Sequence, residues 1–188
     1  MRKDARENRQ KILQAAGDLI AEKGIQAMSM KDVAERAHIG TGTLYRNYAN
    51  KGDLCLGLAN TNIQRFVRDS EALLATDTDP EEKLRQILVS YLRFHEVNRA
   101  PLDGLGADSQ RRLVIYRSDL YQQLVNVFVQ VLQPLRAGLT PADVQFEADM
   151  LIAMMRDETY SFERNVRHLS NEDILQHFSN IFTFRMEE

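Results

Sequence analysis

The stretch that most constrains the fold of this chain lies near its start and runs SMKDVAERAHIGTGTLYRNYANK, from Ser29 to Lys51. Ser29 and Asp32 have the spacing of a capping box, in which each side chain binds the backbone amide of the other residue at a helix start. Apolar residues then recur at helical spacing on one face: Val33, Ala34 and Ala37. The pattern predicts a short amphipathic helix beginning directly after Ser29.

A turn and a second short helix follow. His38 stands where the chain must turn, and His is among the few residues other than Gly that adopt a left-handed conformation. Ile39 is expected to fill the angle between the two helices, and Gly40 can serve as the N-cap of the second. That helix is predicted over residues 41–48. The pair is therefore predicted to be a helix-turn-helix.

The outward residues of the second helix favour contact with DNA. A helix this short is marginal alone, and a glycine inside it costs about 1 kcal/mol relative to alanine. Gly42 makes sense if a phosphate or a base must come close. Asn and Arg suit base edges, whereas Thr, Tyr and Lys suit phosphate oxygens. The alternative is a solvated helical hairpin that binds nothing, and the spacing favours DNA.

Residues 9–56 resemble the DNA-binding domain of the TetR family of bacterial transcriptional repressors. The matching stretches are RQKILQAAGDLIAEKG and MSMKDVAERAHIGTGTLYRNYANKGDL. The chain departs from the family pattern at His38, Gly40 and Gly52, none of which removes a group that faces DNA. The resemblance implies an all-α protein with an N-terminal three-helix DNA-binding domain, residues 1–52. A C-terminal helical domain for ligand binding and dimerisation, residues 53–188, would follow.

The matched positions give the candidate DNA-binding residues: Lys31, Thr41, Gly42, Thr43, Tyr45, Arg46, Asn47, Tyr48 and Lys51. Four are expected to read bases: Thr41, Gly42, Arg46 and Asn47. Four are expected to hold phosphates: Thr43, Tyr45, Tyr48 and Lys51. Asn50 and Asp53 form a second capping box, which places the Lys51 ammonium beside a helix N-terminus where both can bind one phosphate.

The charge distribution agrees with a DNA-binding N-terminal part. The net charge is −3, which alone argues weakly against nucleic acid. Residues 1–52 carry ten basic and six acidic residues, a charge of +4, and the remainder carries −7. There is no apolar run near the length of a membrane span and no apolar signal segment at the start. The single cysteine, Cys55, fits a reducing cytoplasm, so a cytoplasmic protein without a membrane partner is expected.

No strand pattern appears, and about nine helices are expected. Residues 1–8 are interpreted as a loose basic arm or a frayed end, and Gly24 as the left-handed cap of the first helix. The stretch 100–109 is expected to be irregular, and Pro134 to kink or end a helix. Besides the helix-turn-helix, the predicted long helices cover 8–23, 51–75, 80–99, 110–136 with a possible break near 117–119, 140–167, and a last helix capped by Ser170 and Asp173.

The resemblance also implies a ligand pocket and a dimer interface in the C-terminal part. Candidate ligand-binding residues are Phe66, Tyr91, Phe94, His95, Tyr121, Phe128, Met150, Met154 and Asp157. Aromatic and Met side chains adapt to apolar ligands, although each is more often simply core. Candidate dimer residues are Leu151, Met155, Phe162, Ile174, Phe178, Ile181 and Phe182. A dimer is expected because one short helix reads too few base pairs; burial within one chain is the alternative.

The sequence thus predicts a repressor that responds to a small, largely apolar effector. Effector binding would tilt the helix 51–75, so that the spacing of the two DNA-binding domains no longer fits the operator. A DNA-binding activator and a helical interaction protein without DNA binding are the alternatives. Neither catalytic spacing nor metal-ligand spacing appears among the four His and one Cys, so no enzyme, cofactor or metal is expected. Cys55 is interpreted as a packed residue rather than a redox sensor.

Overall fold

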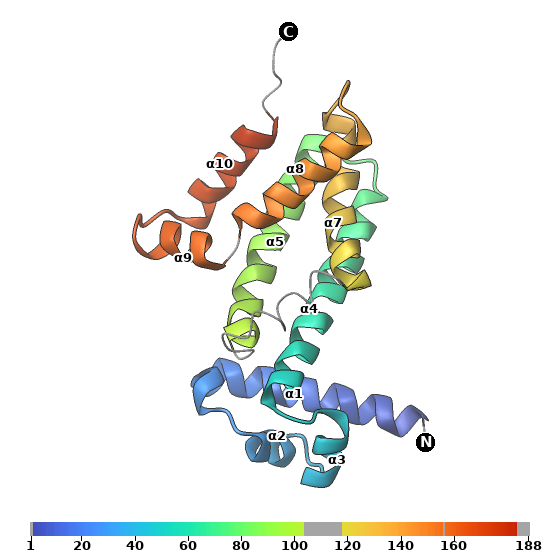
Figure 1. The fold of residues 1–188 in the computed structure, drawn as a ribbon, viewed down its shortest axis with the longest axis vertical. Helices are drawn as coiled ribbons and strands as arrows, with labels where there is room; N and C mark the ends of the chain where they lie inside the picture. Colours follow the sequence, from blue (N-terminus) through green and yellow to red (C-terminus); the bar gives the residue numbers. More distant parts are fainter. Residues whose placement is uncertain (1, 104–117, 156, 184–188) are drawn as a thin grey trace. The chain divides into compact units, whose positions relative to one another are not determined.

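The computed structural model describes residues 2–103, 118–155 and 157–183, and these contain nine α-helices, one 3-10 helix and no strand (Figure 1). The all-α prediction is confirmed. The helices are α1 (Arg2–Ala27), α2 (Met30–Arg36), α3 (Thr41–Asn47), α4 (Lys51–Leu74), α5 (Pro80–Asp103), α7 (Asp119–Leu132), α8 (Pro141–Met154), α9 (Asp157–Asn165) and α10 (Asn171–Thr183), with the 3-10 helix η1 at Gln133–Leu135.

The described residues form two compact units. Unit 1 comprises residues 2–62 together with the part of α5 from Val97 onward. Unit 2 comprises residues 63–96 and the described residues from Ser118 onward. Helices α4 and α5 therefore each contribute residues to both units.

Helix α1 is longer than predicted at both ends. It begins at Arg2 rather than Asn8, so the prediction of a loose arm is wrong for these residues. The reason is that RKDAREN contains several strong helix formers and neither Gly nor Pro. Gly24 has φ 77° and ψ 162°, a conformation that essentially only glycine adopts. It kinks the helix instead of ending it, and Ile25 and Met28 beyond it are buried.

Helix α5 begins as predicted and ends later. Asp79 Oδ1 accepts hydrogen bonds from the amides of Glu81 and Glu82 at 2.9 and 3.3 Å, and Pro80 occupies the first helical position. The helix then continues through Pro101 to Asp103. Pro101 cannot donate the backbone bond of that turn, and it is buried there. The remainder of the stretch predicted to be irregular, residues 104–109, lies outside the described residues.

Helix α7 begins at the predicted break and ends at the predicted proline. Ser118 is its N-cap, with the Tyr121 amide 3.2 Å from Ser118 Oγ. The predicted part from 110 to 117 lies outside the described residues. The helix ends at Leu132, and Pro134 lies in η1. The role predicted for Pro134 is therefore confirmed.

The prediction of one helix over residues 140–167 is wrong. Thr140 and Asp143 form the expected capping box of α8, but Met155 leaves the helical conformation, with φ −90° and ψ 17°. Helix α9 is separate, and its buried Tyr160 places its hydroxyl 2.9 Å from Glu96 Oε1. Neither Gly nor Pro marks this break in the sequence, and the contact that accompanies it joins residues 64 positions apart.

Unit 2 is organised around a cluster of buried apolar side chains from all of its helices. Leu88, Phe128 and Leu151 are fully buried at its centre. In unit 1, Cys55 is also fully buried, and burial raises the pKa of its thiol. A thiol with a raised pKa is a poor nucleophile at neutral pH, which favours the packed interpretation. None of the described helices combines the length and the apolar character that a bilayer crossing requires.

Candidate nucleic-acid interface

The helix-turn-helix forms as its local signals predict. The Ser29 hydroxyl oxygen accepts from the Asp32 amide at 3.1 Å, and the Asp32 carboxylate accepts from the Ser29 amide at 2.9 Å. His38 has φ 53°, the predicted left-handed conformation. Gly40 is the N-cap of α3. Both capping and turn predictions are confirmed.

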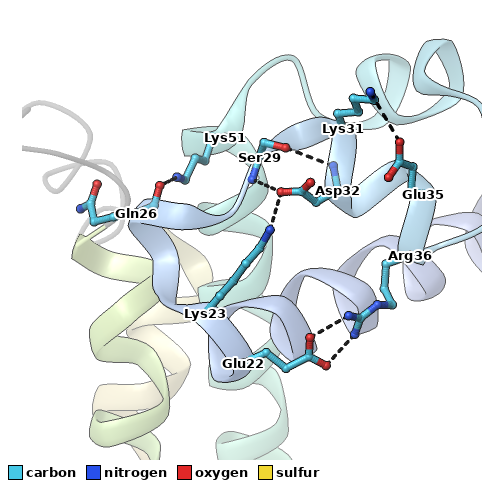
Figure 2. Close-up of polar contacts among 9 residues, drawn as sticks. All are labelled: Glu22, Lys23, Gln26, Ser29, Lys31, Asp32, Glu35, Arg36 and Lys51. Carbon is cyan, nitrogen blue, oxygen red and sulfur yellow. Dashed lines mark hydrogen bonds and ion pairs between the residues drawn. The ribbon is translucent and has the colours of Figure 1, made fainter.

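Two ion pairs fix α2 to α1 (Figure 2). The Arg36 guanidinium makes a two-pronged contact with the Glu22 carboxylate, with both N–O distances at 2.7 Å. Lys23 Nζ lies 2.7 Å from Asp32 Oδ2. Hydrogen bonds from Lys23 and Ser29 hold the pKa of Asp32 well below its usual range. These pairs join residues far apart in sequence, so no local pattern predicts them.

Helix α3 has one buried and one exposed face. Leu44 is fully buried and Tyr48, directly after the helix, is 5 % exposed, so these two residues form the inward face. The exposed residues are Thr41, Gly42, Tyr45, Arg46 and Asn47, with Thr43 partly buried. These small, aromatic, cationic and amide side chains suit the floor and the walls of a DNA groove.

The polar side chains of α3 lie along their own helix. Arg46 Nη2 donates to Thr43 Oγ1 at 3.0 Å, which uses one of the five donors of the guanidinium. Asn47 Nδ2 donates to the Thr43 carbonyl at 2.8 Å. A Cβ placed on Gly42 would meet nothing within 4 Å. Packing within the protein therefore does not require glycine at position 42, and an added Cβ there would point into solvent-accessible space.

Two lysines flank α3 in sequence. Lys31 is exposed on α2, with Nζ 3.8 Å from Glu35 Oε1. Lys51 is the first residue of α4, whose start is capped by Asn50 Oδ1 accepting from the Asp53 amide at 2.9 Å. Lys51 Nζ lies 3.4 Å from the Gln26 carbonyl oxygen (Figure 2). Lys51 is thus partly buried, with its ammonium beside a carbonyl oxygen near the end of α1, and its contact with a phosphate stays a prediction.

Tyr48 is placed inside unit 1 rather than on the exposed face. Its hydroxyl accepts a hydrogen bond from Arg9 Nε at 3.1 Å. A buried ring with an engaged hydroxyl is not presented to a phosphate. The assignment of Tyr48 to a phosphate contact is therefore wrong; its spacing of four residues from the buried Leu44 is the local signal of its burial.

The candidate ligand-binding residues are only partly brought together. Phe66, Tyr91, Phe94 and Phe128 form one aromatic cluster, with ring centroids 5.0 to 6.1 Å apart. His95 is buried beside the Tyr160 ring, at 5.2 Å between centroids. Tyr121 is half-buried and packs against the same core as these rings. Met150 and Met154 are instead exposed on α8, and the side chain of Asp157 lies outside the described residues.

The candidate dimer residues also divide into two groups. Five are buried within unit 2: Leu151, Met155, Ile174, Phe178 and Phe182. Phe162 and Ile181 are exposed. Sequence reasoning missed Phe146, which is 63 % exposed and precedes the exposed Met150 and Met154 at intervals of four residues. That spacing on one helix was the available signal. Among the described residues, no three His, Cys, Asp or Glu side chains gather as metal ligands would.

Comparison with known proteins identifies relatives along the whole chain. The family model of the bacterial regulatory proteins of the tetR family matches residues 12–58. The HTH-type transcriptional regulator SAS2464 of Staphylococcus aureus strain MSSA476 is 30 % identical over 188 residues, covering 100 % of this chain and 98 % of the relative. The regulator SAUSA300_2515 of strain USA300 is 31 % identical over 183 residues, or 97 % of this chain and 96 % of the relative.

Solved structures share the fold. The regulator FadR from Bacillus subtilis in complex with stearoyl-CoA is 17 % identical and has a TM-score of 0.69, covering 94 % of this chain and 99 % of that chain. Thermus thermophilus FadR, a TetR-family repressor in complex with lauroyl-CoA, is 17 % identical with a TM-score of 0.69 and 96 % coverage of both chains. These proteins therefore share the fold of this chain although few of their residues are identical to it.

Proposed function

The chain belongs to the TetR family of bacterial transcriptional regulators, and we propose that it is a repressor released from a pseudo-palindromic operator by a small, largely apolar effector. In this proposal, residues 1–52 form the DNA-binding domain and residues 53–188 the ligand-binding and dimerisation domain. The exposed polar face of α3 above the buried Leu44 carries the proposal, because it offers the groups that recognise DNA and keeps the apolar ones inside.

The proposed division of labour on DNA follows exposure and chemistry. Base reading is assigned to Thr41, Gly42, Arg46 and Asn47, and phosphate contacts to Thr43, Tyr45, Lys51 and Lys31. Tyr48 is omitted because it is buried. Asn47→Ala is expected to blur the preference at one base pair, worth about 1–3 kcal/mol; an equal loss on every sequence would contradict a base contact.

We propose a homodimer formed through exposed apolar side chains of unit 2. Phe146, Met150 and Met154 line one face of α8, and Phe162 and Ile181 are exposed on α9 and α10. Exposed apolar groups on a soluble protein often mark an interface. Phe146→Glu is expected to shift the protein toward monomer in sedimentation and to weaken DNA binding. The control Val97→Glu changes another exposed apolar residue, 60 % exposed, outside these three helices.

The effector is proposed to bind in unit 2 near the aromatic cluster of Phe66, Tyr91, Phe94 and Phe128. These rings offer apolar contact area, and two proteins of the same fold bind acyl-CoA. Because α4 contributes to both units, a change at Phe66 can act on residues 51–62 through a single helix. A coupling of about 1–3 kcal/mol between ligand and DNA suffices for such control.

The experiment is to select duplexes that the full chain binds from a random pool, followed by gel shifts at low and high salt. We expect an inverted repeat whose half-sites lie about one DNA turn apart, and release of the duplex by long-chain acyl-CoA or another apolar compound. Failure to bind any duplex in dilute buffer would favour the interaction-protein alternative. Increased transcription from the selected site would favour the activator alternative.

A further inference from the structure

The Tyr48 ring lies so close to Gly57 that no side chain other than that of glycine fits at position 57 without moving the ring. Gly57 lies inside α4, and a Cβ built there would be 2.6 Å from Tyr48 Cε1, 3.0 Å from the hydroxyl oxygen and 3.1 Å from Cζ. Real Cβ contacts are not this short, so a side chain at position 57 would displace the ring. Glycine costs stability in a helix interior, and this approach of the ring accounts for its presence.

A second contact engages the same ring from α1. Arg9 Nε donates to the Tyr48 hydroxyl at 3.1 Å, and the guanidinium carbon lies 5.8 Å from the ring centroid. The latter distance lies within the range of a cation–π contact. Tyr48 directly follows α3 and is only 5 % exposed. One side chain at the end of α3 is thus in contact with both α1 and α4.

We infer that Tyr48 is a positioning residue, held between Arg9 and Gly57, that fixes the orientation of α3 on α4. This inference rests on the proposed binding of DNA by α3. With seven residues, α3 is too short to be stable alone, so its orientation depends on what its ends and its buried Leu44 contact. A shift of the ring would move the base-reading residues as a group, without removing any of them.

Paired substitutions at the contact test the inference in the full chain. Gly57→Ala introduces the clash, and Tyr48→Leu removes Cε1, Cζ and the hydroxyl, the three atoms that the new Cβ would meet. Each single variant is expected to lower the melting temperature by about 5 °C and to weaken binding to the selected duplex roughly tenfold. The double variant is expected to recover most of both losses, because the added methyl group then occupies space that the ring has left.

Two further variants separate the possible causes. Gly17→Ala is the matched control, because Gly17 is also helical, on α1, and an added Cβ meets nothing within 4 Å. It is expected to raise the melting temperature slightly and to leave DNA affinity unchanged. Tyr48→Phe keeps the ring and removes the hydroxyl bond with Arg9. Its affinity for DNA is expected to stay within about threefold of that of the natural protein, since the ring provides most of the contact with Gly57.

Several outcomes would overturn the inference. Full affinity in Gly57→Ala would show that the ring does not need this glycine. A double variant as weak as Tyr48→Leu would indicate that the tyrosine contacts DNA directly. An equal loss in Tyr48→Phe would show that α3 depends on the hydroxyl bond with Arg9 and not on the ring beside Gly57. If the natural chain binds no duplex at all, the proposed function fails, and the melting temperatures of the five variants still decide whether the Tyr48–Gly57 contact fixes α3.

Discussion

Unit 1 and unit 2 differ in what holds their helices in place. In unit 1, α2 and α3 have seven residues each and depend on a capping box, two ion pairs to α1 and a few buried side chains such as Leu44. In unit 2, helices of nine to 24 residues share one cluster of buried aromatic and aliphatic side chains. Single polar or steric contacts can therefore reorient a helix in unit 1, whereas unit 2 responds mainly to changes in buried volume.

The largest expected effect comes from emptying a core position in each unit. Leu88 on α5 and Leu44 on α3 are both fully buried. We expect Leu88→Ala to cost about 4 kcal/mol of unfolding free energy and Leu44→Ala about 2–3 kcal/mol, because a short helix relaxes more readily around the cavity. Urea unfolding measures both. Only Leu44→Ala should abolish duplex binding. If both variants lost the same unfolding free energy and Leu44→Ala still bound the duplex, the distinction between the units would be wrong.

The next effect compares two capping boxes of the same design. Ser29 with Asp32 caps α2 in unit 1, and Thr140 with Asp143 caps α8 in unit 2. Ser29→Ala and Thr140→Ala should each cost about 1 kcal/mol in thermal or urea unfolding. Affinity for the selected duplex should fall only in Ser29→Ala, because α2 contacts α3, the proposed recognition helix, whereas α8 lies in unit 2. Equal losses of affinity would mean that both units set the geometry of α3.

A smaller effect is expected from a single charge. Lys51→Ala should weaken binding to all sequences alike and reduce the salt dependence of binding by about one ion. Lys83→Ala is the matched control, since Lys83 Nζ also donates to backbone carbonyls, those of Leu74 and Thr76, but lies in unit 2. Binding isotherms at several salt concentrations measure both slopes. An unchanged slope for Lys51→Ala would exclude a phosphate contact.

The smallest effect is on acid stability. Hydrogen bonds from Arg85 and Gln86 lower the pKa of Glu82 from 4.5 to about 2, and those from Lys23 and Ser29 lower the pKa of Asp32 from 3.8. A lowered native pKa adds stability above the ordinary pKa, and this is lost as pH falls toward the native pKa. Melting temperatures between pH 5 and about 2 should fall less steeply in Glu82→Gln and Asp32→Asn. Both groups are exposed, so the change is small.

Most of the features predicted correctly from the sequence depend on residues that are close together in the chain. The capping boxes of α2 and α8, the Asn50 cap of α4, the left-handed His38 and the end of α7 at Pro134 each depend on residues a few positions apart. The exposed face of α3 follows from the same helical spacing. Fold and helix-turn-helix were therefore accessible from the sequence alone, together with most of the exposed candidate residues.

The features that could not be predicted depend on residues distant in sequence. The break before α9 accompanies the contact between Tyr160 and Glu96, and the contacts of the Tyr48 ring come from Arg9 and from the space at Gly57. Apolar periodicity likewise could not separate the exposed Phe146 from the buried Leu151, because both fit a helix that is apolar on more than one side. Only tertiary packing decides which apolar face of α8 lies inside.

The burial of Cys55 has a practical consequence. The chain has one cysteine, it lies in unit 1, and burial raises the pKa of its thiol. A thiol reagent therefore reacts appreciably only when that part of the protein opens. The rate at which the folded protein consumes such a reagent therefore measures how often unit 1 opens around Cys55. A bound duplex should slow this reaction, and unit 2 contributes no signal to it.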